Sequence, residues 1–315
     1  MLNKTIRILN FDNSILKQSI LFSQYEHTVI DFKDFAPKAR HWTDSKTRSL
    51  IEKRVVNSAK DSITFIGSGD FHHISEILIS RFDQPISVIV FDAHPDWAGL
   101  SPQFSCGSWL NEILKKETIV KLVLMGISSD DISGFNIQTG NLNSLKNDRV
   151  EIYPHTHRPS TTFLKKIPPN ASIGINRGVL FNRIFWNELK DKNLAGFIQT
   201  LLNRIPAKKV YISIDKDCLN NNHAITNWEE GKLSLEELLL MLRLIKQNMD
   251  IIGLDICGDY SPVSIQGGIK RIISRLDHPK DIKADELEDY VITAINQDTN
   301  LKILQCLSEE KANPE

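Results

Sequence analysis

Residues 88–96 read VIVFDAHPD, an apolar run that ends in three residues able to bind metals, Asp92, His94 and Asp96. Side chains alternate faces along a strand, so an extended conformation would place these three on one side. The apolar run before them is typical of a parallel strand that is buried on both faces. Open α/β sheets bind ligands at the carboxyl ends of such strands, so this stretch predicts both a fold and a site.

Two other strand ends carry similar side chains. VYISIDKD, residues 210–217, ends with Asp215 and Asp217, and GSGDFHH, residues 67–73, offers His72 or His73 at the start of a helix. Four carboxylates in one pocket would repel one another unless cations compensate their charge, and two divalent ions would neutralise all four. Two such ions about 3.5–4 Å apart could share a water and lower its pKa towards neutrality. Oxygen-rich ligation favours Mn²⁺ over structural Zn²⁺, which prefers thiolates. The expected ligands are His72, Asp92, His94, Asp96, Asp215 and Asp217.

The remaining sequence alternates strand-like and helical patterns, which predicts an α/β protein with a mostly parallel sheet covered on both faces. A Ser234–Glu237 capping box marks one helix start. Without a linker or an internal repeat, residues 1–315 are expected to form a single domain that is frayed over 309–315. The stretch 155–186 is the least periodic part of the sequence. Strands are expected at 5–11, 27–32, 63–67, 87–92, 121–127, 149–154, 210–215 and 251–256. Helices are expected at 45–60, 73–81, 108–117, 187–204, 234–248 and 284–308.

Composition restricts the partners of this 315-residue chain. Its formal net charge of −1 gives no support for nucleic acid or an anionic membrane as the main partner. No segment approaches the roughly 18 apolar residues that a membrane span needs, and no signal peptide is evident. The four cysteines have no spacing typical of a disulfide framework or a CxxC zinc site. We therefore expect a cytoplasmic protein that acts on a small molecule.

The motifs GSGDFHH, DAHPD and SIDKD resemble, in order and spacing, the three ligand motifs of the arginase/agmatinase (ureohydrolase) family. IIGLDICGDYSP, residues 251–262, resembles that family's late strand. The resemblance covers roughly residues 60–270. It implies a three-layer α/β/α fold with an eight-stranded, mostly parallel sheet, and often a homo-oligomer. It also implies two Mn²⁺ ions per chain on the six residues named above, with Asp92 and Asp215 as bridging ligands and a bridging hydroxide that attacks a guanidinium carbon.

Several residues depart from the family pattern. Phe71 is inserted in the first motif, so that His73 competes with His72 as the ligand. Cys106 stands where many members have a His that shuttles protons. The family's Glu that holds the guanidinium aligns with Gly258 or, after one insertion, with Asp259. The Pro-Gly-rich substrate loop is replaced by DKDCLNNNHAITNWEEG, residues 215–231. The chain is thus predicted to be a divergent member and not an arginase.

These comparisons predict a metal-dependent hydrolase of a non-peptide C–N bond, acting on a guanidino, amidino or related substrate. Asp92 and Asp217 would orient the nucleophile, and Cys106 would act as a proton donor or be a small core residue. Asp259, His223 and Trp228 are the candidate substrate contacts, although strand-end carboxylates and surface loops often have no such role. Asp255 is expected to support a ligand histidine. Two alternatives remain open: a deacylase-type amidohydrolase with a single Zn²⁺, and a non-catalytic protein that uses the metal for structure or sensing.

Overall fold

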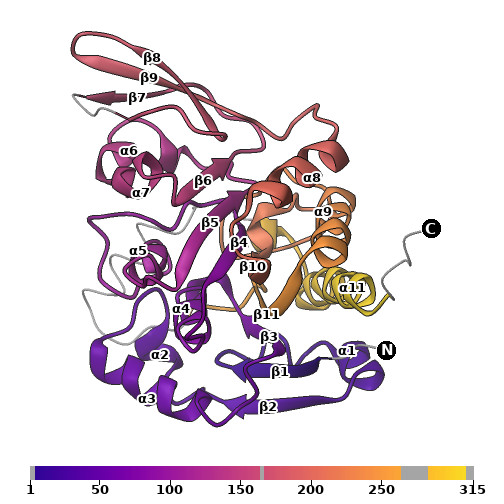
Figure 1. Cartoon of the computed structure of the whole chain (residues 1–315). Coiled ribbons are helices and arrows are strands. Elements are labelled where there is room, and N and C mark those ends of the chain that lie inside the picture. The colour runs from indigo at the N-terminus through magenta and orange to yellow at the C-terminus, as the bar shows by residue number, and fades with distance from the viewer. Residues whose placement is uncertain (1–3, 164–166, 264–282, 310–315) are drawn as a thin grey trace.

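A central sheet of eight parallel strands organises the computed structural model, which describes residues 4–163, 167–263 and 283–309. The strand order is β2-β1-β3-β11-β10-β4-β5-β6 (Figure 1). All eight predicted strands are confirmed, with ends that differ from the prediction by at most two residues. Their bounds are β1 Thr5–Asn10, β2 His27–Asp31, β3 Ser62–Gly67, β4 Ile86–Phe91, β5 Ile119–Met125, β6 Val150–Tyr153, β10 Lys209–Asp215 and β11 Asp250–Cys257.

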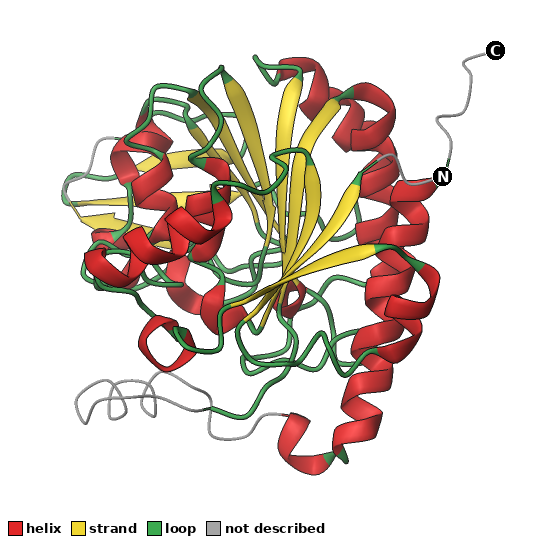
Figure 2. Cartoon of the chain, turned by 90° about the horizontal axis from the view of Figure 1, so that it is seen from below, coloured by secondary structure: helices red, strands yellow, loops and turns green. Residues whose placement is uncertain are grey.

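Helices cover both faces of this sheet, which gives the three-layer α/β/α architecture (Figure 2). The predicted Ser234–Glu237 capping box is present at the start of α9. None of the described helices combines the length and the apolar character needed to cross a membrane. One layer contains α2 Ala36–Ala39, α3 Ser45–Val55, α4 Ile74–Ile79, α5 Trp109–Ile113 and α7 Leu142–Lys146. The other contains α1 Ser19–Gln24, α8 Leu194–Arg204, α9 Leu235–Asn248 and α11 Asp289–Ser308.

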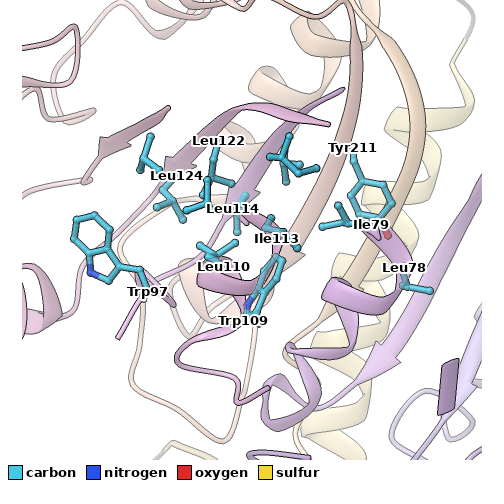
Figure 3. Packing of buried hydrophobic residues seen from close by; sticks show 14 of the residues in the cluster. Leu78, Ile79, Trp97, Trp109, Leu110, Ile113, Leu114, Leu122, Leu124 and Tyr211 are labelled. Atoms are coloured by element: carbon cyan, nitrogen blue, oxygen red, sulfur yellow. The ribbon is translucent and has the colours of Figure 1, made fainter. Parts of the chain in front are cut away.

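The apolar strands bury alternate residues in two separate cores. Val88 and Val90 of β4 belong to one core, whereas Ile89 and Phe91 belong to the other. In the first core, side chains of α5 and the residue after it pack beside β5, as Leu110, Leu114 and Leu122 show in Figure 3. Each fully buried side chain of this size contributes about 1.5–3 kcal/mol of transfer free energy. The strand ends are therefore held on a rigid platform.

The least periodic part of the sequence, residues 155–186, nevertheless contains regular structure. This stretch contains a separate antiparallel sheet with the strand order β7-β9-β8, formed by β7 Ser160–Phe163, β8 Ile173–Arg177 and β9 Phe181–Trp186. Its strands lack a strong apolar pattern because they are largely exposed: β9 buries only Ile184 and Trp186. At the other end of the chain, the predicted fraying over 309–315 falls almost entirely outside the described residues.

Candidate metal centre

The six predicted ligands converge at one edge of the sheet, beyond neighbouring central strands. Strands β3, β11, β10 and β4 lie side by side and run in the same direction, so their carboxyl ends meet. His72 follows β3 after the 3-10 turn η1 Gly69–Phe71, Asp92 follows β4, and Asp215 closes β10. Asp217 lies in the next 3-10 turn, η3 Lys216–Cys218. The edge expected from the sequence is thus the edge where these side chains gather.

The ligand atoms form two groups that share Asp92. In the first group, His72 Nδ1 lies 3.1 Å from Asp92 Oδ2, 3.1 Å from Asp96 Oδ2 and 3.5 Å from Asp215 Oδ2. In the second, His94 Nδ1 lies 2.9 Å from Asp217 Oδ2 and 3.6 Å from Asp92 Oδ1. Donors that each bind one ion at about 2.0–2.2 Å lie roughly 3 Å from one another. The nitrogen and oxygen donors therefore fit two divalent cations, with one oxygen of Asp92 directed to each.

The structure separates the two candidate histidines of the first motif. His72 is buried within the cluster. The His73 ring lies elsewhere, with Nε2 2.7 Å from the Thr43 hydroxyl. The extra residue Phe71 ends the η1 turn and packs against Phe11 in the core. The geometry thus favours His72 as the ligand.

One detail of the sequence argument is wrong, because strand alternation does not align Asp92, His94 and Asp96. Strand β4 ends at Phe91, and Asp96 has a left-handed φ of 42°. The turn that contains Pro95 directs the three side chains to two different groups. Asp96 is also held by Trp109, whose Nε1 donates to Asp96 Oδ2 over 2.6 Å.

A buried chain of hydrogen bonds supports His72 from behind. His72 Nε2 lies 2.9 Å from Ser213 Oγ, which donates to Asp255 Oδ1 over 2.7 Å. The other Asp255 oxygen accepts from the Tyr211 hydroxyl over 2.7 Å. A proton on His72 Nε2 would leave Nδ1 free to bind a cation, which is the arrangement typical of metal-binding histidines. Asp255, expected from the sequence to support a ligand histidine, reaches His72 through the Ser213 hydroxyl.

The charge balance of the cluster also fits cations. Burial, followed by repulsion from neighbouring carboxylates, raises the pKa of Asp215 to about 8, of Asp96 to about 7 and of Asp217 to about 6. Burial also opposes ionisation of Asp92, but its bonds to His72 and His94 hold the pKa of Asp92 below its usual value. Without cations, the cluster would keep protons near neutral pH. Two divalent ions would replace those protons.

Two glycines make room for Asp215, and they explain one departure from the family pattern. Gly258 has a φ of +88°, and a Cβ there would lie 2.5 Å from Asp215 Oδ1. A Cβ on Gly69 would lie 2.7 Å from Asp215 Oδ2. Position 258 therefore cannot hold the family's glutamate unless Asp215 moves.

A cavity of about 480 Å³ opens above the cluster. Two of its wall segments are paired, since Cys106 N donates to the His41 carbonyl over 2.8 Å and Trp42 bridges to Ser105. The predicted residues Cys106 and Trp228 both line the cavity. Sequence reasoning missed other wall residues, among them His41, Trp42 and Glu229. In the sequence, these residues are marked by aromatic and charged side chains that lie close together in segments with no helix or strand pattern.

Two of the predicted substrate contacts lie away from this cavity. Asp259 is buried against Lys216, with Oδ1 2.9 Å from Nζ, and it also accepts from Gln18 over 2.6 Å. His223 lies 3.8 Å from Glu236, and neither Asp259 nor His223 lines the cavity. The expectation that they contact a substrate there does not fit this arrangement, because buried pairing and loop packing already account for them.

Trp228 is held in the wall by Asp70, a residue that the sequence analysis did not single out. The indole Nε1 donates to Asp70 Oδ1 over 3.1 Å, and Arg40 binds the other oxygen over 2.7 Å. The edge of the Trp228 ring system faces His94, with ring centroids 5.5 Å apart. The same motif that supplies His72 thus also positions a cavity wall.

Sequence comparison finds one matching protein family and one similar protein. A model of the arginase family matches residues 171–269, which include Asp215, Asp217 and the late strand β11. Over this part of its length the chain is similar to the arginase family. An uncharacterised protein of Thermotoga maritima is 31% identical over 201 residues, which is 64% of this chain and 59% of that protein. The match therefore spans somewhat more than half of that relative's length.

Solved structures of the family share the fold. An arginase from Bacillus caldovelox superposes with a TM-score of 0.57 and 11% identity, over 98% of this chain and 99% of that one. The proclavaminate amidino hydrolase of Streptomyces clavuligerus gives 0.54 and 13%, over 98% and 94%. The formimidoylglutamase of Bacillus subtilis gives 0.55 and 16%, over 96% and 86%. These similarities confirm the arginase-like α/β fold of this chain.

Proposed function

We propose that this arginase-family member is a metal-dependent hydrolase of a non-peptide C–N bond in a guanidino, amidino or related compound. One observation carries the proposal: two imidazoles and four carboxylates form two donor groups joined by Asp92, at the floor of a 480 Å³ cavity. The family match and the fold support a hydrolase of this class. When bound, two divalent cations such as Mn²⁺ would activate water for attack on the central carbon of the substrate.

The chain's own residues would prepare that attack. Asp92 would hold both halves of the centre in register, and Asp217 would orient the nucleophile together with His94. The Asp217 carboxylate is itself fixed by the Ala93 amide, which donates to its Oδ1 over 3.0 Å. Cys106, which is partly exposed in the cavity wall, would supply a proton to the leaving amine.

The walls favour a small substrate with a cationic or neutral reacting group. Among the described residues that line the cavity there is no lysine or arginine, whereas Glu229 and Asp131 add two carboxylates beyond the cluster. Glu229 Oε2 lies 3.5 Å from His94 Nε2, so a carboxylate stands beside the centre from the opposite wall. This acid could face a guanidinium in place of the family's glutamate. We further propose a reducing compartment such as the cytoplasm, because the four cysteines lack the spacing of a disulfide framework.

The experiment is an activity screen of Mn²⁺-loaded protein on guanidino, formimino and N-acyl compounds, with urea, ammonia and amine as the measured products. The proposal expects turnover of at least one class that is abolished in Asp217→Asn. Asp83→Asn is the matched control, because the Asp83 side chain is 92% exposed and lies outside the cavity. No turnover on the whole panel, with two metal ions bound per chain, would overturn the proposal in favour of a structural or sensing role.

A further inference from the structure

Cys257 lies at the metal centre, although no motif drew attention to it. It closes β11, the strand between β3 and β10, and pairs in register with Asp215 on one side and Gly67 on the other. The side chain is fully buried, and Sγ lies 3.2 Å from Asp215 Oδ2. Donor atoms of His72, Asp215 and Cys257 all lie within 4.8 Å of one another. The Cys257 thiol is therefore one of the donor atoms that surround the position of the first candidate ion.

A second observation, on Asp92 at the same side of the cluster, supports a cation at this position. Asp92 is 1% exposed, and apart from the His72 ring nitrogen no described residue is placed to donate a hydrogen bond to its Oδ2. The side of the cluster that Cys257 joins thus contains a buried carboxylate oxygen whose charge a neutral core would not balance. Burying a carboxylate without a compensating charge costs free energy, and a bound divalent ion would supply that compensating charge.

We propose that Cys257 is a thiolate ligand of the ion held by His72 and Asp215, so that the two ions of the centre occupy chemically different sites. The first site would combine nitrogen, oxygen and sulfur donors, and the second, at His94 and Asp217, would have only nitrogen and oxygen. When the ion binds, the S–H bond breaks, the proton leaves to solvent and a sulfur–metal bond forms without any change in oxidation state. The inference rests on the proposed function only in requiring the two-ion centre.

The consequence is a division of metal preference within one centre. Soft thiolate donors favour Zn²⁺ and similar borderline ions, whereas carboxylate-rich sites suit Mn²⁺. The first site would then select Zn²⁺, Co²⁺ or Fe²⁺, and the second would keep the preference for Mn²⁺. The alternative role for Cys257 is a hydrogen bond that merely positions the Asp215 carboxylate.

Titration of the full-length apo-protein with Co²⁺ distinguishes these roles, because only a cobalt–thiolate bond gives a charge-transfer band in the near ultraviolet. We expect the wild-type band to saturate after one of two bound ions. Cys257→Ser should lose the band and weaken Zn²⁺ binding by at least about tenfold, the lower end of what loss of a supporting residue costs. Cys106→Ser is the matched control, because Cys106 lines the same cavity outside the donor groups, and it should keep the band.

Two bound cobalt ions without a thiolate band would overturn the proposal, as would a band that Cys106→Ser abolishes and Cys257→Ser leaves intact. If Cys257→Ser does not fold, X-ray absorption of the zinc-loaded Cys106→Ser protein still decides: a sulfur scatterer at about 2.3 Å supports the proposal and its absence refutes it. A failure of the proposed hydrolase function can be distinguished from a failure of the Cys257 proposal, because the cobalt–thiolate band does not depend on turnover. Protein that shows the band but hydrolyses nothing would refute only the hydrolase.

Discussion

The floor of the cavity lies at the ends of neighbouring strands, whereas its walls come from segments far apart in the chain. The floor residues are buried and hold one another, as the 3.1 Å contact between His72 and Asp92 illustrates. The walls pair the segment at Trp42 with that at Ser105 and add the loop at Trp228. The difference suggests that the floor determines how the protein activates water and the walls determine for which molecule.

Removing the residue shared by both halves of the floor should have the largest effect. Asp92→Asn replaces a carboxylate that faces both donor groups with a neutral amide, so both ions should be lost together. We expect metal affinity to fall by more than about 100-fold, beyond the range for supporting residues. Equilibrium dialysis with Mn²⁺ measures it, with Asp83→Asn as the control. A variant that keeps one tightly bound ion would show that Asp92 does not join the two sites.

Stability without metal should fall as pH rises from about 4 to about 8. The folded state raises the pKa of Asp96 to about 7 and of Asp215 to about 8, whereas unfolded aspartates ionise near pH 3.9. The folded chain then binds more protons than the unfolded chain, and this contribution is lost as pH passes through the folded values. Saturating Mn²⁺ should reverse the trend. Urea unfolding with and without a chelator tests this, and chelated protein that becomes more stable with pH would contradict it.

Weakening the support of the floor should have a smaller effect. Ser213→Ala removes the hydroxyl between His72 and Asp255, so the ring loses the partner that orients it. We expect a loss of about 10-fold to 100-fold in metal affinity. Ser75→Ala is the matched control, because Ser75 donates to Asp255 without contacting the ring. Equal losses in both variants would mean that Asp255 acts through general packing.

A change in the wall should alter recognition and leave the floor intact. Trp228→Phe keeps an aromatic ring but loses the hydrogen bond to Asp70, which is worth about 1 kcal/mol, or roughly fivefold. On a substrate found by the screen, we expect KM to rise by about that factor with unchanged metal content. A loss of bound metal would instead place Trp228 in the support of the floor.

The same division explains what the sequence could predict. Apolar runs indicate buried strands, so all eight strands and the five floor residues other than His72 could be located from local pattern. The choice between His72 and His73 could not, because it depends on the turn that contains Phe71. Asp259 was misplaced because its buried partner Lys216 belongs to a different strand end. His41 and Glu229 join the site only through tertiary contacts, which no local period records.

A centre of two ions on the cavity floor underlies the proposed function, and the metal content of the purified protein shows whether both ions bind. After saturation with Mn²⁺ and removal of excess ion, elemental analysis should find two ions per wild-type chain. Asp217→Asn should retain one, because the group at His72 does not include Asp217. One ion per wild-type chain, unchanged in Asp217→Asn, would contradict the claim and favour a single-ion centre.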